Sequence, residues 1–216
     1  MSTLVHEVKN PLVAISTFAH LLPERYEEEE FRGEFSRLVG VEVKRLNGVL
    51  EMLLEYGQLG APRPHYLDLP KWLRNYADER RWSSNQRISM DFSGSLPRVQ
   101  FDERHLNFIL ERIFAQIQSR GIAGGDIRIC GAEAATEENL VKYEILYDEQ
   151  GSYTQTPVRS DHSIEEQDFE GLSLGLGLAR RIMKKNHGEM SVLPGEGKGT
   201  RILLQFSTRA FGQPVS

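Results

Sequence analysis

The chain has 216 residues, of which 39% are hydrophobic and 26% are charged, a composition typical of a globular protein with one large domain or two small ones. Its formal net charge of -5 argues against the clustered Lys and Arg that a nucleic-acid backbone requires, so we expect no nucleic-acid partner. The single cysteine, Cys130, excludes an internal disulfide and every multi-cysteine metal motif, which is typical of a reducing compartment.

Long apolar segments are missing from the sequence. No run approaches the roughly 18 to 20 apolar residues that cross a bilayer, and the first residues do not have the basic-then-apolar order of a signal peptide. We therefore expect no membrane contact by these residues and a cytoplasmic location, which is also compatible with the cytosolic part of a longer sensor protein.

Two amphipathic helices are predicted in the first sixty residues. Apolar side chains recur every three or four positions over residues 3–22 and again over residues 35–53, and a charged turn containing the run EEEE joins the two segments. A hairpin of two such helices covers only part of its apolar surface, which favours a homodimer that forms a four-helix bundle. A hairpin that packs against the rest of its own chain is the alternative.

A domain boundary is predicted after this hairpin. The stretch GAPRPHYLDLP, residues 60–70, contains three prolines and a glycine that break the helical period, so it predicts a linker. We place the boundary after residue 64, which divides the chain into residues 1–64 and residues 65–216.

The second domain alternates between helical and strand patterns. Helices are predicted at 69–81, at 102–121 with Asp102 as the N-cap, and at 175–188 with Gly188 as the closing residue. Strands are predicted at 87–94, 97–102, 126–132 and 140–148, and a pair of strands within 189–206. Since the last two strands form a hairpin, the pattern favours an α/β two-layer sandwich with a mixed sheet, and the whole chain belongs to the α+β class.

The segment HEVKNPL, residues 6–12, places polar side chains inside the first helical pattern. His6 and Asn10 are four residues apart and therefore share one helix face, where both can act on one ligand. Glu7 can accept an N–H bond from the imidazole at an angle, which leaves the other ring nitrogen as a nucleophile. Pro11 cannot donate to the carbonyl of Glu7, so the helix should loosen in the turn that carries His6.

This segment resembles the phosphoacceptor box of the two-component sensor histidine kinases, a family in which a helical hairpin precedes a Bergerat-type ATP-binding domain. The resemblance implies that His6 carries phosphate, that Glu7 assists as an acid/base, and that Asn10 positions water when the phosphoaspartate of a partner is hydrolysed. It also implies a homodimer and a response-regulator receiver domain as partner.

The C-terminal region carries a second resemblance to that family. The stretch GLSLGLGLARRIMKKNHGEMSVLPGEGKGTRILLQF, residues 171–206, is similar to the second glycine box and the final hairpin of the ATP-binding domain. The resemblance implies that Gly171, Gly175, Gly177 and Thr200 contact ATP, that Asp148 accepts a hydrogen bond from adenine, and that the position of Gln116 holds Mg²⁺. Glycines near a helix N-terminus let backbone amides approach phosphate.

Three departures from the family pattern weaken the expectation of ATP and Mg²⁺ binding. Arg112 and Gln116 occupy the two asparagine positions of the long helix, and the longer side chain of Gln116 would displace a ligand. Gln150 and Ser152 replace both glycines of the first glycine box, and Ser173 replaces the middle glycine of the second. Residues between Asp148 and Gly171 also lack the Phe-containing lid motif of the family.

The interpretation of function is a histidine-kinase-type transmitter module that exchanges phosphate between His6 and a receiver aspartate, with ATP-dependent autophosphorylation weak or absent. Two alternatives stay open: a non-catalytic dimeric scaffold that docks a receiver domain, and a fully active ATP-dependent kinase. An unrelated Bergerat-fold ATPase of the chaperone or mismatch-repair kind is disfavoured, because those proteins do not place HEVKNPL on a preceding hairpin.

Overall fold

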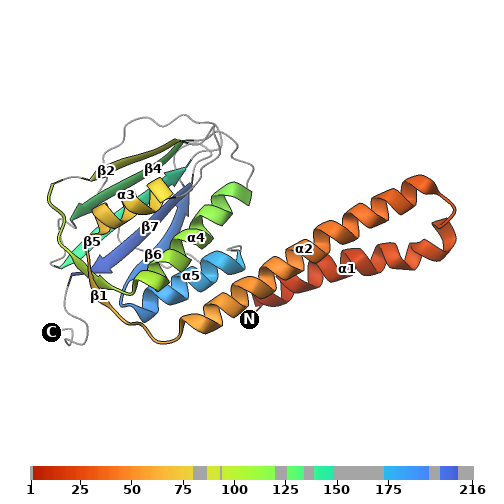
Figure 1. The fold of residues 1–216 in the computed structure, drawn as a ribbon, viewed down its shortest axis with the longest axis horizontal. Coiled ribbons are helices and arrows are strands. Elements are labelled where there is room, and N and C mark those ends of the chain that lie inside the picture. Colours follow the sequence, from red (N-terminus) through yellow and green to blue (C-terminus); the bar gives the residue numbers. More distant parts are fainter. Residues whose placement is uncertain are drawn as a thin grey trace. The chain divides into compact units, whose positions relative to one another are not determined.

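A computed structural model describes residues 2–79, 87–92, 94–119, 126–133, 139–147, 173–194 and 200–208. The chain forms two compact units (Figure 1): residues 1–60 with 171–174, and residues 61–170 with 175–216. The first contains the helical hairpin and the second contains the sheet and its helices, so each is described by itself. No helix in the described ranges combines the length and apolarity needed to span a bilayer.

The hairpin consists of α1 (Ser2–Arg25) and α2 (Glu29–Leu59). Helix α1 continues through Pro11 and Pro23, so the predicted loosening does not interrupt the helix. Pro11 is buried, and its ring replaces a backbone N–H that would otherwise bond to the carbonyl of Glu7. The hydrophobic stripe predicted for α1 is only partly covered, because Val5 and Leu12 lie in it and are 56% and 50% exposed.

The turn between the two helices is held by aromatic and charged contacts. Phe31 is 1% exposed and stacks on Phe18 with ring centroids 5.8 Å apart. The guanidinium of Arg25 lies 4.7 Å from the centre of the Phe31 ring and also pairs with Glu28. A stacked aromatic pair with one buried ring, under a cation–π contact, is a specific closure for the hairpin, while the neighbouring glutamates stay exposed.

The second unit is built on a five-stranded sheet with the order β2-β4-β5-β7-β6. Its strands are β2 (Arg87–Phe92), β4 (Asp126–Glu133), β5 (Leu140–Tyr147), β6 (Glu189–Pro194) and β7 (Thr200–Ser207). Strands β2 and β4 are parallel, whereas the other neighbours are antiparallel. The predicted mixed sheet is therefore confirmed.

A separate two-stranded ribbon takes one of its strands from the segment predicted as a linker. Strand β1 (His65–Leu67) pairs antiparallel with β3 (Val99–Phe101). The sequence does not reveal β1 because three residues are too few for a visible alternation. The pairing joins the residues that follow the hairpin to the strand that leads into the helix Glu103–Ser119.

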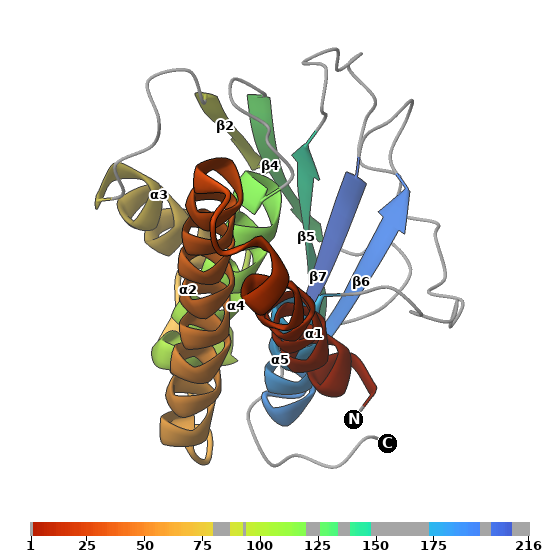
Figure 2. The same cartoon turned by 90° about the vertical axis from the view of Figure 1, so that its right-hand side faces the viewer.

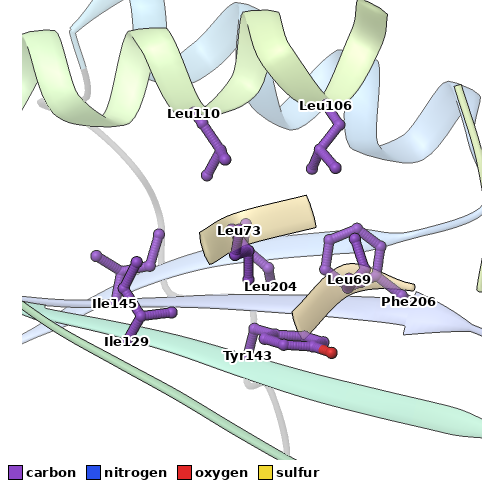
Figure 3. A pocket seen from close by; sticks show the side chains of 9 residues that line it. All are labelled: Leu69, Leu73, Leu106, Leu110, Ile129, Tyr143, Ile145, Leu204 and Phe206. Carbon is purple, nitrogen blue, oxygen red and sulfur yellow. The ribbon is translucent and has the colours of Figure 1, made fainter. Parts of the chain in front are cut away.

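Helices α3 (Leu69–Glu79), α4 (Glu103–Ser119) and α5 (Leu174–Lys185) cover one face of the large sheet (Figures 1 and 2). Leucines of α3 and α4 point toward the inward side chains of β4, β5 and β7 around a small apolar cavity (Figure 3). The lining residues are Leu69, Leu73, Leu106, Leu110, Ile129, Tyr143, Ile145, Leu204 and Phe206. The core thus lies between the helix layer and the sheet, as a two-layer sandwich requires.

The end of α5 differs from the prediction that Gly188 closes it. His187 has a φ of 57° and is the left-handed residue, while the N–H groups of His187 and Gly188 bond to the carbonyls of Lys184 and Met183. This is the Schellman arrangement with a histidine where glycine is usual. Gly188 is needed for another reason, because a Cβ there would lie 2.8 Å from the carbonyl oxygen of Gln205.

Candidate functional site

The segment HEVKNP occupies the first turns of α1, and its polar residues divide between two directions. His6 and Asn10 are exposed and lie four residues apart on one face of the helix. Glu7 is only 25% exposed and turns toward α2. The helix therefore presents an imidazole and an amide together to solvent, as the sequence predicts for a pair that acts on one ligand.

Glu7 contacts a residue that the sequence analysis did not select. Its Oε2 lies 3.4 Å from Nη2 of Arg45, an ion pair that joins the two helices. No hydrogen bond between Glu7 and His6 occurs in the described part of the hairpin, so the carboxylate faces the guanidinium and not the imidazole. Positions 7 and 45 lie at nearly equal distances along the chain from the turn, and this counting could have identified Arg45.

Large apolar side chains remain exposed on both helices of the hairpin. Those on α1 include Val5, Leu12 and Val13, and those on α2 are Val41, Val43, Leu50 and Leu54. Val5 and Leu12 are one heptad apart, and so are Val43 and Leu50. Heptad spacing of uncovered apolar residues is the pattern of a helical seam without its partner.

The long helix α4 carries the residues expected at the nucleotide. Gln116 and Arg112 are four positions apart, so they lie on the same face of the helix and both are partly exposed. The guanidinium of Arg112 lies 5.1 Å from the centre of the Phe108 ring and pairs with Glu111 at 3.3 Å. A cation one turn from Gln116 favours phosphate but opposes a divalent metal at the same amide.

Two glycines of the second glycine box lie in the first turn of a helix, in agreement with the helix predicted at 175–188. Helix α5 begins at Leu174, so Gly175 and Gly177 belong to its first turn and Ser173 takes the N-cap position. The first N–H groups of a helix have no intrahelical acceptor and can bind an anion. A Cβ at Gly177 would meet nothing within 4 Å, so packing does not require glycine there.

Thr200 begins β7 and pairs with Tyr147, the last residue of β5. Asp148 is the next residue in sequence, and it lies outside the described residues together with Gly171. The departures at Gln150 and Ser152 also lie outside them. Within the described ranges, no group of three or more His, Cys, Asp or Glu side chains could hold a metal ion.

Helix α4 is anchored at its N-terminus by a buried polar network. Asp102 is the predicted N-cap: its Oδ1 accepts the backbone N–H of Arg104 at 2.9 Å, and its Oδ2 accepts that of Arg63 at 2.7 Å. Burial alone would raise the pKa of Asp102, but bonds from the side chain of Arg104 and from these two N–H groups lower the pKa to about 2.

The same network joins α4 to the end of α5. The side-chain amide of Asn186 donates to Nδ1 of His105 at 2.8 Å and to the carbonyl of Ile182 at 2.9 Å. Its oxygen accepts the backbone N–H of Asp102 at 3.3 Å. These bonds fix the two helices that carry Gln116 and Gly175 relative to each other, although no sequence pattern indicates that residues 105 and 186 meet.

Comparisons with known proteins give one consistent result. The family described as the His Kinase A (phospho-acceptor) domain matches residues 1–62. The sensor protein kinase PilS of Pseudomonas aeruginosa is 24% identical over 213 residues, which cover 94% of this chain and 39% of that protein. Sporulation kinase C of Bacillus subtilis is 26% identical, over 91% of this chain and 46% of that protein. The chain thus spans less than half the length of these relatives.

A solved structure shares the fold of the chain. The histidine kinase ThkA, crystallised in complex with the response regulator TrrA, superposes with a TM-score of 0.63 at 17% identity, over 96% of this chain and 60% of that chain. At this identity the likeness establishes the fold, in which a helical region precedes a mixed α/β sheet. The phospho-acceptor match over residues 1–62 and the kinase relatives support a place for the chain in the two-component sensor histidine kinase family.

Proposed function

We propose that the chain is a transmitter module that carries phosphate on His6 and exchanges it with an aspartate of a response-regulator receiver domain. The observation that supports this most is the exposure of His6 and Asn10 on one face of α1, with Glu7 beside them. In this proposal the imidazole takes the phosphoryl group, Glu7 assists as acid/base, and Asn10 orients water for hydrolysis of the phosphoaspartate. Residues 1–64 form the phosphotransfer hairpin and residues 65–216 the catalytic-type domain.

The proposed partners follow from the surface of the hairpin and from the family. Exposed apolar residues at heptad spacing favour a homodimer in which two hairpins form a four-helix bundle. A receiver domain then docks beside His6, as the response regulator in the ThkA complex suggests for this family. We place the chain in the cytoplasm, where its one cysteine stays reduced. Burial raises the pKa of the Cys130 thiol, which disfavours the reactive thiolate.

Binding of ATP with Mg²⁺ is proposed to be weak or absent. The first turn of α5 presents backbone N–H groups that have no acceptor within the helix itself, a feature that suits a phosphate, and ATP bound there would supply the phosphoryl donor. The face of α4 fits less well, because the charge of Arg112 stands one turn from Gln116, the residue expected to hold the metal. Micromolar, Mg²⁺-dependent binding of ATP in a calorimetric titration would contradict this proposal and favour the fully active kinase.

The transfer itself is tested with a set of phosphorylated receiver domains. The expected result is an acid-labile label on the chain that disappears in His6→Ala, or faster dephosphorylation of the receiver that depends on Asn10. Stable binding of a receiver without a label and without faster dephosphorylation would favour the non-catalytic scaffold, which the exposed apolar residues of the hairpin would also support.

A further inference from the structure

Arg45 of α2 is the charged residue that reaches the phospho-acceptor segment from the opposite helix. Its Nη2 lies 3.4 Å from Oε2 of Glu7, and the described contacts include no other ion pair to residues 6–11. The Arg45 side chain is 48% exposed, and its guanidinium has N–H donors beyond the one that faces Glu7. None of the roles assigned above uses this residue.

The ion pair determines the charge beside His6. Glu7 follows His6 directly in α1, and its carboxylate would by itself place a negative charge next to the imidazole. The side chains of Glu7 and Arg45 together carry no net charge. This matters because a phosphoryl group adds nearly two negative charges to the imidazole, and like charges at close range oppose each other.

We propose that Arg45 neutralises Glu7 and thereby favours the phosphorylated form of His6. This inference rests on the proposed function, since it requires His6 to accept phosphate. Arg45 is a positioning residue: it need not touch the phosphoryl group, because it acts by offsetting the charge of Glu7 and by keeping that carboxylate on the α2 side. Removal of the positive charge leaves Glu7 to repel the incoming group, so the inference predicts a loss of phosphorylation. A gain would overturn it and would show that the freed carboxylate acts mainly as the acid/base.

The test uses phosphoramidate, a small donor that requires neither ATP nor a receiver domain. A ring nitrogen of His6 attacks phosphorus, a new P–N bond forms, and the P–N bond of the donor breaks. The donor nitrogen leaves as ammonia with a proton, and the phosphoryl group remains on the imidazole. Intact mass and acid lability of the product give the rate of phosphorylation and the occupancy reached, and His6→Ala defines the background.

The matched pair of variants is Arg45→Gln and Lys44→Gln. Both remove one positive charge from neighbouring exposed positions, but only Arg45 contacts Glu7. We expect Arg45→Gln to lower rate and occupancy about 2- to 5-fold relative to Lys44→Gln, the range that one exposed ion pair gives. Arg45→Lys should recover most of the loss, and the difference between the glutamine variants should shrink toward 1 M salt.

Three other outcomes would also overturn the inference. Equal phosphorylation of the two glutamine variants would show that the charge at residue 45 has no special effect. A deficit in Arg45→Gln that salt does not reduce, or that Arg45→Lys does not recover, would show that Arg45 acts through helix packing. Absence of any His6-dependent label on the unaltered chain would refute the proposed function itself, and circular dichroism of each variant identifies loss of the hairpin.

Discussion

The charge of Asp102 should contribute measurably to the stability of the second unit. Asp102 is 2% exposed and accepts hydrogen bonds from Arg63 and Arg104, which hold its pKa at about 2. Relative to an ordinary value of 3.8, the shift corresponds to about 2 kcal/mol of folding free energy at neutral pH. Asp102→Asn keeps an acceptor for the helix cap but removes the charge, so it should destabilise the chain by about 2 kcal/mol at pH 7.

The pH dependence follows from the direction of the shift. Because the folded pKa is below the unfolded one, the contribution is complete above about pH 4 and is lost as the pH falls toward 2. Denaturant unfolding followed by tryptophan fluorescence is a suitable assay, since one of the two tryptophans, Trp72, donates its indole N–H to Glu103 in the first turn of α4. The difference between the two proteins should fall to about half at pH 3.

A matched control separates the charge of Asp102 from its role as a cap. Asp68 caps α3 through a bond from the N–H of Lys71 at 3.0 Å, but it is exposed. Asp68→Asn should therefore change stability by only a few tenths of a kcal/mol, since Asp and Asn cap about equally well. If both variants lose the same stability, or if the loss in Asp102→Asn persists at pH 2, the charge of Asp102 is not what stabilises the helix.

Three further predictions concern individual side chains. His187→Gly should stabilise the chain by roughly 1 kcal/mol, because glycine has no steric penalty in the left-handed region. Gly188→Ala should destabilise the chain, because the added Cβ would contact the Gln205 carbonyl oxygen. Thermal unfolding measures both changes. Tyr143→Phe should be at least as stable as the original in urea, because the Tyr143 hydroxyl is buried without a partner in the described structure, and a clear loss would reveal a bonded water. Leu50→Asp should convert a dimer into a monomer in sedimentation experiments, and an unchanged mass would place the dimer seam elsewhere.

Periodicity predicted the helices and most strands because side chains on one face of an element recur at the period of that element. In α4 the buried positions repeat at three and four residues, and in β5 the inward side chains Tyr143 and Ile145 alternate as expected. What periodicity could not supply are features that depend on contacts distant in sequence. Strand β1 is three residues long and exists through its pairing with β3, and the left-handed His187 depends on the Schellman bonds that close α5.

The residues of the candidate site also fall into those that a local motif locates and those that only the folded chain brings together. His6, Glu7 and Asn10 could be located from one contiguous motif, because four-residue spacing alone places two of them on one face. Arg45 belongs to no local motif, and only counting outward from the turn between the two helices relates it to Glu7. The helix start beside Ser173 and Gly175 was predicted to within one residue. A difference of one residue is within the variation with which helix ends are assigned.

The unusual residues of α4 lie where the fold does not depend on them. Arg112 and Gln116 are on the partly exposed face, whereas Ile113 and Ile117, one position further along, are fully buried in the core. Changes on the exposed face leave the packing free energy of the helix intact, so the domain keeps its fold even if it binds nucleotide poorly. The fold of the hairpin does involve a residue of the candidate site, because Glu7 belongs to the phospho-acceptor segment and also forms the ion pair between α1 and α2. A chain with these properties can lose ATP as its phosphoryl donor while it retains the histidine that we propose receives phosphate from another protein.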